Sequence, residues 1–326
     1  MSVKSRELVE WAAPIRLVCC STQSHAPIQR RFGTVNMGEL NDLKRHEEWD
    51  RETLVEEHVE KDAIYYALGI GARRFKELHL IYEKHPNFQV FPTFCASSSL
   101  SALDLENCPG IGYDLKRTLH GEQYVQVFKP LPKNGSIRTE ARIVDMLQRG
   151  RHMAILCEAT CYDNKSDEKL AYLQFLIWQL NHYNTKGLRW SNEVIETIQR
   201  PDTEPKKVIE EELDDDLPSI YRQASGDLNP LHIDPEFSKN LGLQEPIMHG
   251  FCTLGVVTRM ILNEYADKDY TKFKAIKVKF SAPVTPGAHL AVSTWRGVEY
   301  GRILFEAKDL KTNTVVLADA YLDLKP

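Results

Sequence analysis

Apolar and polar residues alternate in several stretches of about ten residues, as expected of strands that bury one face of a sheet. Two such stretches, HMAILCEATCYDN and KLAYLQFLIW, follow one another in mid-chain, and RILFEAKDLKT and TVVLADAYLDL do so near the end. Asn, Asp, Lys and Gly interrupt them, as short turns between antiparallel strands require. The longest apolar run, at 170–180, contains two glutamines and is too short for a membrane span, so we predict a buried strand.

These strands belong to a longer internal repeat. The stretches VFKPLPKNGSIRTEARIVDML (127–147) and VKFSAPVTPGAHLAVSTWRGV (278–298) each pass from an aromatic residue through a proline-rich kink and a glycine turn into alternating positions. Upstream, AIYYALGIG (63–71) and SIYRQASGD (219–227) are separated by nearly the same number of residues as these two stretches. The repeat indicates two halves of common ancestry.

Each half therefore predicts a helical opening followed by an antiparallel meander, an α+β fold with a helix on one face of a sheet. We divide the chain into an N-terminal extension at 1–49, a first half at 50–180, an acidic linker at 181–217 and a second half at 218–326. The linker contains Pro201 and Pro205, with Pro218 directly after it, and an acidic run, and like charges favour a solvated segment. Placed side by side, each half would protect an exposed sheet edge of the other.

Charge and cysteine content exclude several classes of protein. The net charge of −5 argues against a nucleic-acid partner, which requires a concentrated basic surface. Seven scattered cysteines without a CxxC pair favour a reducing compartment over a disulfide framework or a cysteine zinc site. Residues 1–35 carry five basic residues against two acids, a weak match to a mitochondrial transit peptide. The final LDLKP is not an SKL-type peroxisomal signal.

Candidate chemistry concentrates in SGDLNPLHID, residues 225–234. Gly226 and Pro230 prevent one smooth helix here and so hold Asp227 and His232 in a fixed, nonperiodic relation. Such a pair can polarise a water molecule, because the carboxylate accepts one proton while the imidazole accepts or returns another near neutral pH. On spacing alone, an ordinary DLNP turn remains an alternative.

A metal site with His249 and Asp234 as further ligands is a third alternative, but the region contains no HxxxH or HxH pairing, so we predict no metal. Downstream, EPIMHGFCTLGVVTRMIL (245–262) begins as a turn and becomes apolar at helical spacing. Gly250 and Gly255 suit close packing of this helix. A glycine N–H near a helix start can also donate to a developing oxyanion.

The segment YRQASGDLNPLHIDPEF (221–237), followed by PIMHG (246–250), resembles the motif of the (R)-specific enoyl-CoA hydratases of the hydratase 2 type, within the MaoC-like dehydratases. Three first-half segments resemble the eukaryotic two-repeat form: KDAIYYALGIGA, LIYEKHPNFQVFPTF and LHGEQYVQVFKPLP. The resemblance runs from about residue 50 to the end. It implies a double hot-dog fold, in which two antiparallel sheets each wrap around a long helix.

The resemblance further implies a hydro-lyase that reversibly hydrates trans-2-enoyl-CoA to (3R)-3-hydroxyacyl-CoA in fatty acid β-oxidation. It needs no cofactor, because CoA is part of the substrate. In this family Asp227 and His232 would activate the water that adds to C3, Asn229 would orient the site, and the Gly250 N–H would bind the thioester oxygen. The positions that match substrate-binding residues of the family are Tyr66, Glu83 and His249.

The resemblance also implies a peroxisomal homodimer without a membrane span that cooperates with a separate (3R)-hydroxyacyl-CoA dehydrogenase. Two other functions stay open: a noncatalytic acyl-CoA-binding subunit, and a hot-dog thioesterase, which would release free CoA thiol. The intact pair favours the hydratase, since a pure binder has no need of Asp227 and His232 together.

Overall fold

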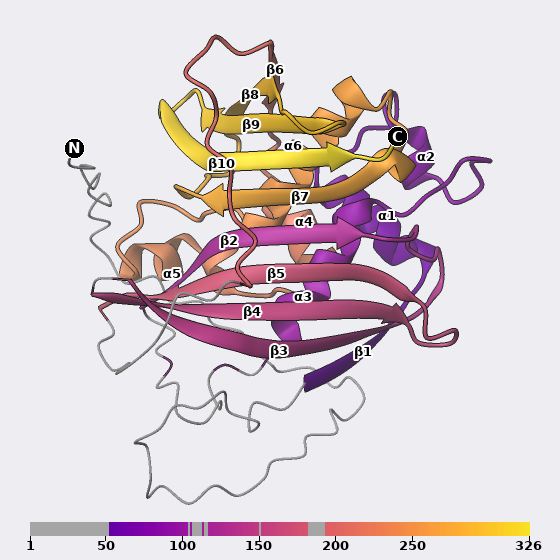
Figure 1. The fold of residues 1–326 in the computed structure, drawn as a ribbon, viewed down its shortest axis with the longest axis horizontal. Helices are drawn as coiled ribbons and strands as arrows, with labels where there is room; N and C mark the ends of the chain where they lie inside the picture. The colour runs from indigo at the N-terminus through magenta and orange to yellow at the C-terminus, as the bar shows by residue number, and fades with distance from the viewer. Residues whose placement is uncertain (1–51, 104, 106–112, 114–116, 150, 182–192) are drawn as a thin grey trace, which may run out of the picture.

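The structure, a computed structural model, describes residues 52–103, 105, 113, 117–149, 151–181 and 193–326. Within these residues, ten strands form one antiparallel sheet in the order β1-β3-β4-β5-β2-β7-β10-β9-β8-β6 (Figure 1). The first-half strands are β1 (Glu52–His58), β2 (Thr118–Val127), β3 (Gly135–Arg149), β4 (His152–Asp163) and β5 (Lys169–Gln179). The second-half strands are β6 (Lys207–Glu212), β7 (Phe273–Phe280), β8 (His289–Arg296), β9 (Arg302–Asp309) and β10 (Thr314–Leu324).

The strand order confirms the repeat. Read inward from one edge the order is β1-β3-β4-β5-β2, and from the other it is β6-β8-β9-β10-β7, the same succession five strands later. The predicted buried strand at 170–180 is β5. The two halves meet where β2 pairs with β7, with Gln123 opposite Val278. Each half therefore protects an edge of the other, as expected.

The helices gather behind the sheet in the view of Figure 1. They are α1 (Glu60–Gly69), α2 (Leu78–Ile81), α3 (Ser97–Ser101), α4 (Leu217–Ser225), α5 (Pro235–Asn240) and α6 (Gly250–Tyr265), with 3-10 turns η1 (Pro92–Ala96), η3 (Pro230–His232) and η4 (Tyr270–Lys272). Helix α6 is buried at every position from Phe251 to Leu262, as a helix enclosed on all sides must be. None of the helices in the described part of the chain is long and apolar enough to cross a membrane.

The α+β architecture is confirmed, and among the described residues the expected long helix is present in the second half. Helix α6 has 16 residues. At the corresponding place in the first half, the described helical residues are those of η1 and the five of α3, while residues 106–112 and the extension at 1–49 lie outside the described residues.

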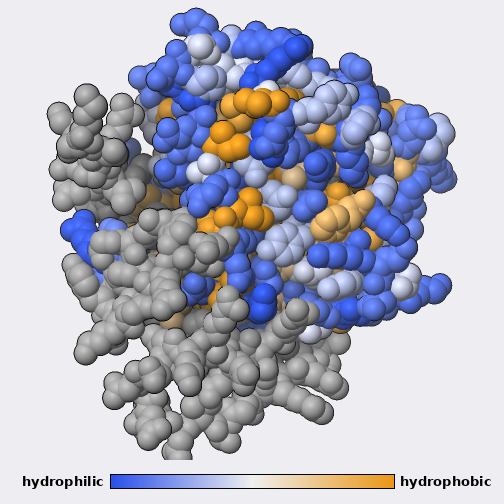
Figure 2. Space-filling view, viewed as in Figure 1, coloured by the Kyte–Doolittle hydropathy of each residue, from blue (hydrophilic) through white to orange (hydrophobic). Residues whose placement is uncertain are grey.

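The segment predicted as a solvated linker is instead bound to the sheet over its described part, 193–217. Residues 193–206 cross the outer face of the sheet (Figure 1), which is largely hydrophilic with small separate apolar areas (Figure 2). Hydrogen bonds fix this crossing, among them Gln174 Nε2 to Glu193 O (2.8 Å), Ile198 N to Asp319 O (3.1 Å) and Trp295 Nε1 to Thr203 O (2.9 Å).

The acidic run then forms edge strand β6, which pairs with β8. Partners on neighbouring elements offset its repulsion, because Glu211 pairs with the Arg259 guanidinium and Glu210 lies 3.2 Å from His289 Nε2. Counting like charges along the chain could not reveal these partners. The domain boundaries themselves remain a prediction.

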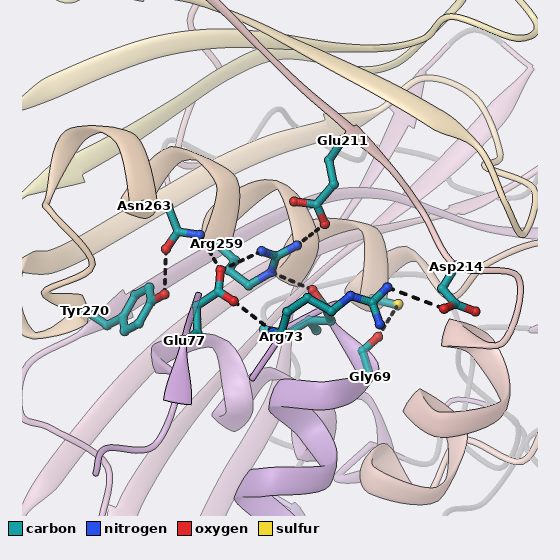
Figure 3. A network of polar contacts seen from close by, with 10 residues as sticks. Gly69, Arg73, Glu77, Glu211, Asp214, Arg259, Asn263 and Tyr270 are labelled. Carbon is teal, nitrogen blue, oxygen red and sulfur yellow. Dashed lines mark hydrogen bonds and ion pairs between the residues drawn. The ribbon is translucent and has the colours of Figure 1, made fainter. Parts of the chain in front are cut away.

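A buried arginine joins the two halves. Arg259 of α6 is 1% exposed, and its Nη1 lies 3.0 Å from Oε1 of Glu77, a first-half residue that is fully buried. Its Nε donates to Ile70 O at 2.9 Å, and its Nη2 pairs with Glu211 of β6 (Figure 3). One guanidinium therefore binds first-half backbone, a first-half carboxylate and the edge strand of the second half.

Both carboxylate oxygens of Glu77 accept further hydrogen bonds. Its Oε1 accepts from Asn263 Nδ2 at 2.7 Å and its Oε2 accepts from Arg73 N at 2.8 Å, while Tyr270 Oη donates to Asn263 Oδ1 at 2.6 Å (Figure 3). Complete hydrogen bonding is what makes a buried carboxylate tolerable.

Close backbone approach seats α6 against the first half. A Cβ added at Gly255 would lie 2.5 Å from Ile70 Cγ2, so only glycine fits, and the expectation of close packing is confirmed there. A Cβ at Gly250 would meet Phe280 at 3.4 Å, an ordinary contact. Gly250 is therefore not required for packing, which leaves its backbone N–H as the feature of interest.

Replacing Arg259 by Met should lower the free energy of unfolding by about 3–5 kcal/mol, because Glu77 would remain buried without its cation. Urea denaturation measures the difference. The matched control is Lys129→Met, whose partner Glu168 is half-exposed and whose loss should cost about 0–1 kcal/mol. Equal losses of unfolding free energy in the two variants would contradict a stabilising role for the buried Arg259–Glu77 pair.

Candidate active site

The predicted break between α4 and the following turn is present. Helix α4 ends at Ser225, and its C-cap is Gly226, whose φ of +71° is a left-handed conformation that suits glycine. Asp227 Oδ1 then accepts from Asn229 N at 3.1 Å, and Asn229 Oδ1 accepts from Leu231 N at 3.0 Å, with Pro230 as the first residue of η3. Side-chain oxygens thus fix the backbone turn. Asn229, 2% exposed, acts on the site through this turn.

His232 faces Asp227 with an unprotonated nitrogen. Its Nδ1 lies 2.7 Å from Ile247 O, and since a carbonyl can only accept, Nδ1 carries the hydrogen and Nε2 keeps its lone pair. Nε2 lies 3.9 Å from Asp227 Oδ2, longer than a direct hydrogen bond but suited to one bridging water. Burial lowers the pKa of His232, although the Asp227 carboxylate partly opposes this.

His249 supports the pair from behind. Its ring stacks on His232 at 3.7 Å between centroids, and its Nε2 donates to Asp227 O at 3.2 Å. Burial, followed by the neighbouring His232, lowers the pKa of His249 well below its usual value, so the ring is neutral. The stack holds both the imidazole and the backbone of the acid in place.

Gly250 follows as the first residue of α6, with His249 as its N-cap. The N–H of a first helical residue has no acceptor within its own helix and lies at the positive end of the helix dipole. This end of α6 can therefore stabilise a developing negative charge.

Of the other two predicted substrate-binding residues, Tyr66 is buried and Glu83 is exposed. Tyr66 is fully buried, donates to Thr93 O at 3.0 Å, and stands behind Tyr221, whose ring centroid is 5.6 Å away. Tyr66 therefore packs behind Tyr221, and its hydroxyl lies close to Gly255 of α6. Glu83 is exposed just beyond α2 in a surface depression with Val59, Lys61 and Ile64. Among the contacts of the described residues, none brings it to Asp227 or His232.

Asp227, His232 and His249 also place one possible ligand atom each within 4.8 Å of one another. Asp234, considered above as a further ligand, instead caps α5 by accepting from Glu236 N at 2.9 Å and Phe237 N at 3.1 Å. The Nε2 proton of His249 is bound to a carbonyl, while its Nδ1 is buried without a hydrogen-bond partner. The absence of a metal stays a prediction.

Two parts of the site were missed in the sequence. The Tyr221 ring lies 5.0 Å from that of His249; the sequence signals for it were its place at the start of the 221–237 motif and the position that it shares with an aromatic residue of the first half. The carbonyl of Ile247 sets the His232 tautomer. Any residue supplies a carbonyl, so no sequence signal points to it.

Two five-stranded repeats in one sheet, a central helix, and an Asp–His pair beside the start of that helix define the double hot-dog, MaoC-like class. Comparisons with known proteins agree: residues 57–179 match the MFE-2 hydratase 2 N-terminal domain, and residues 196–319 match the MaoC like domain. The chain belongs to the hydratase 2 family.

Among relatives, peroxisomal multifunctional enzyme type 2 of Mus musculus is 38% identical over 274 residues, which are 82% of this chain and 37% of that protein. The peroxisomal enoyl-CoA hydratase 2 of Arabidopsis thaliana is 31% identical over 82% of this chain and 90% of its own length. The solved Drosophila melanogaster multifunctional enzyme type 2 has a TM-score of 0.74 and 32% identity over 85% of this chain and 48% of that one. The chain thus spans less than half of the multifunctional relatives.

Nitrogen-15 NMR should show His232 as the Nδ1–H tautomer and His249 as the Nε2–H tautomer, both neutral at pH 6.5, with H232Q and H249Q used to assign the signals. Because both pKa values are lowered on folding, the unfolded chain binds more protons. The free energy of unfolding should therefore fall as the pH drops below about 6.5. Stability that rises on acidification to pH 5.5 would contradict this assignment.

Proposed function

We propose that this chain reversibly hydrates trans-2-enoyl-CoA to (3R)-3-hydroxyacyl-CoA in fatty acid β-oxidation. The observation that carries the proposal is the 3.9 Å spacing of the Asp227 carboxylate and the unprotonated His232 Nε2. The relatives named enoyl-CoA hydratase 2 and multifunctional enzyme type 2 support it.

In the proposed reaction, one water bridges Asp227 Oδ2 and His232 Nε2. Its oxygen adds to C3 while the pair takes up one proton, and the pair returns one proton to C2, so hydroxyl and hydrogen together account for the water. Charge that develops on the thioester oxygen is stabilised by the Gly250 N–H at the start of α6. The neutral state of His232 at physiological pH follows from its burial.

The other predicted residues act as supports in this proposal. Asn229 fixes the turn that carries Asp227, and His249 holds both members of the pair. Tyr66 backs Tyr221, which in turn packs on His249. For Glu83, whose side chain is exposed, we propose no part in the chemical step.

The chemistry requires no cofactor, since water and the enoyl thioester are the complete reactants. We propose a peroxisomal location from the names of the relatives; the mitochondrial alternative rests on residues 1–35, outside the described residues, and stays open. The product is a secondary alcohol, so a (3R)-hydroxyacyl-CoA dehydrogenase is the proposed partner, and the homodimer remains a prediction.

Asp227→Asn and His232→Ala should each lower kcat by about a hundredfold or more, the usual contribution of a general acid or base. Turnover is followed as loss of the enoyl thioester absorbance. The matched control is Asp234→Asn, seven residues from Asp227, because Asn also caps a helix and should leave kcat within about twofold.

Near-normal turnover in both Asp227 and His232 variants would overturn the mechanism. A thiol reagent added to the same assay separates the alternatives. Release of free CoA thiol would instead indicate a thioesterase, and binding of crotonyl-CoA without any product would indicate a noncatalytic subunit.

A further inference from the structure

A cavity of about 140 Å³ lies where the end of β2 meets the start of β7. Its wall is formed by buried side chains: Phe88, Val90, Val127, Leu131, Tyr270 and Phe273. Lys133 and Thr271, which also line it, are exposed, so the cavity opens to solvent. Because an apolar cavity of about 150 Å³ can hold benzene, this space is large enough for a small organic molecule.

The cavity is distant from the proposed active site. Helix α6 begins at Gly250 and has 16 residues, so it is about 24 Å long. Tyr270 of the cavity wall lies just beyond the other end of α6, where its hydroxyl donates to Asn263 Oδ1 at 2.6 Å (Figure 3). A ligand in the cavity would therefore leave Asp227 and His232 free.

The internal repeat relates this cavity to the active site. Phe128 corresponds to Phe280 in the repeat, so the loop after β2 matches the loop after β7. The loop after β7 borders the active site, because Met248 N donates to Val284 O at 2.7 Å. The loop after β2 supplies Leu131 to the cavity wall. The cavity is therefore the first-half counterpart of the place that holds the Asp–His pair.

This counterpart lacks the groups that hydration needs. In the repeat, Gly71 stands where the second half has Asp227. The segment FPTFC matches MHGFC and places Pro92 where the second half has His249. Pro92 lines the cavity and has no group that could transfer a proton. We therefore expect binding without turnover in the cavity.

Two lysines give the cavity a cationic side. Lys133 Nζ lies over the Phe88 ring, 5.5 Å from its centroid, and Lys325 is a further lining residue. Among the described residues, neither lysine forms a salt bridge with an acid. Burial lowers the pKa of Lys325, and a bound anion would offset that desolvation. The cavity thus combines an apolar interior with two cations that lack an acidic partner.

We propose that this cavity is a second, noncatalytic site that binds a short aliphatic carboxylate. The hydrocarbon occupies the apolar interior, and the carboxylate contacts Lys133 and Lys325. Charge complementarity favours this occupant, because an uncharged hydrocarbon would leave both lysines without a partner and a purely polar anion would leave the apolar wall unfilled. The site does not depend on the proposed hydration, since none of its lining residues takes part in that reaction.

The test uses hexanoate as the probe and saturation-transfer NMR on the full chain to measure its dissociation constant. Lys133→Gln and Lys325→Gln should each weaken hexanoate binding by about two- to fivefold, the contribution of an accessible ion pair, and leave binding of uncharged 1-hexanol unchanged. Thr271→Trp, at an exposed position of the lining, should abolish binding of both by filling the cavity mouth. The matched control is Lys129→Gln, a lysine paired with Glu168 outside the cavity, which should change neither dissociation constant.

Absence of saturable hexanoate binding to the wild type would overturn the proposal. Binding that persists in folded Thr271→Trp, or that is insensitive to both lysine substitutions, would do the same. Butyryl-CoA is then added to compete for the active site. Hexanoate that stays bound supports a separate site, whereas its displacement would place it in the active site and contradict a second one.

Discussion

The buried guanidinium of Arg259 is the constraint on which the arrangement of the two halves depends. It binds Glu77 and the Ile70 carbonyl of the first half and Glu211 of the edge strand, all from within α6. A shift of α6 along its axis would separate the buried Arg259 cation from the buried Glu77 carboxylate, which is strongly unfavourable. The position of α6 sets the position of Gly250 and His249 at its other end. The ion pairs of Arg259 therefore help to position the Asp227–His232 site without contacting it.

The repeat has become asymmetric in its chemistry while keeping its symmetric sheet. The second half carries the long helix and the Asp–His pair. The first half contributes residues that reach across the joint: Glu77 to Arg259, Tyr66 to Tyr221, and His120 to Phe251. In the proposed mechanism one half performs the chemistry and the other supports it, which gives a reason to retain both copies.

Short-range patterns in the sequence were sufficient to predict the strands, the two halves and the turn that carries the Asp–His pair. Period-two alternation located the strands, the repeat implied two halves joined edge to edge, and Gly226 and Pro230 marked the break that presents Asp227 and His232. Contacts between distant residues were not accessible in this way. The acidic run at 210–216 was predicted to be a solvated linker from its like charges. That prediction was wrong because the counterion of Glu211 is Arg259, 48 residues further along the chain. The carbonyl of Ile247 depends on backbone geometry, which composition does not encode.

In the proposed reaction, one Asp–His pair in the second half adds water to a fixed face of an enoyl thioester. Chiral analysis of the product that the wild-type protein forms from trans-2-enoyl-CoA shows which face receives the water. We expect (3R)-3-hydroxyacyl-CoA as the enoyl absorbance decays. Formation of the (3S) product would contradict the account.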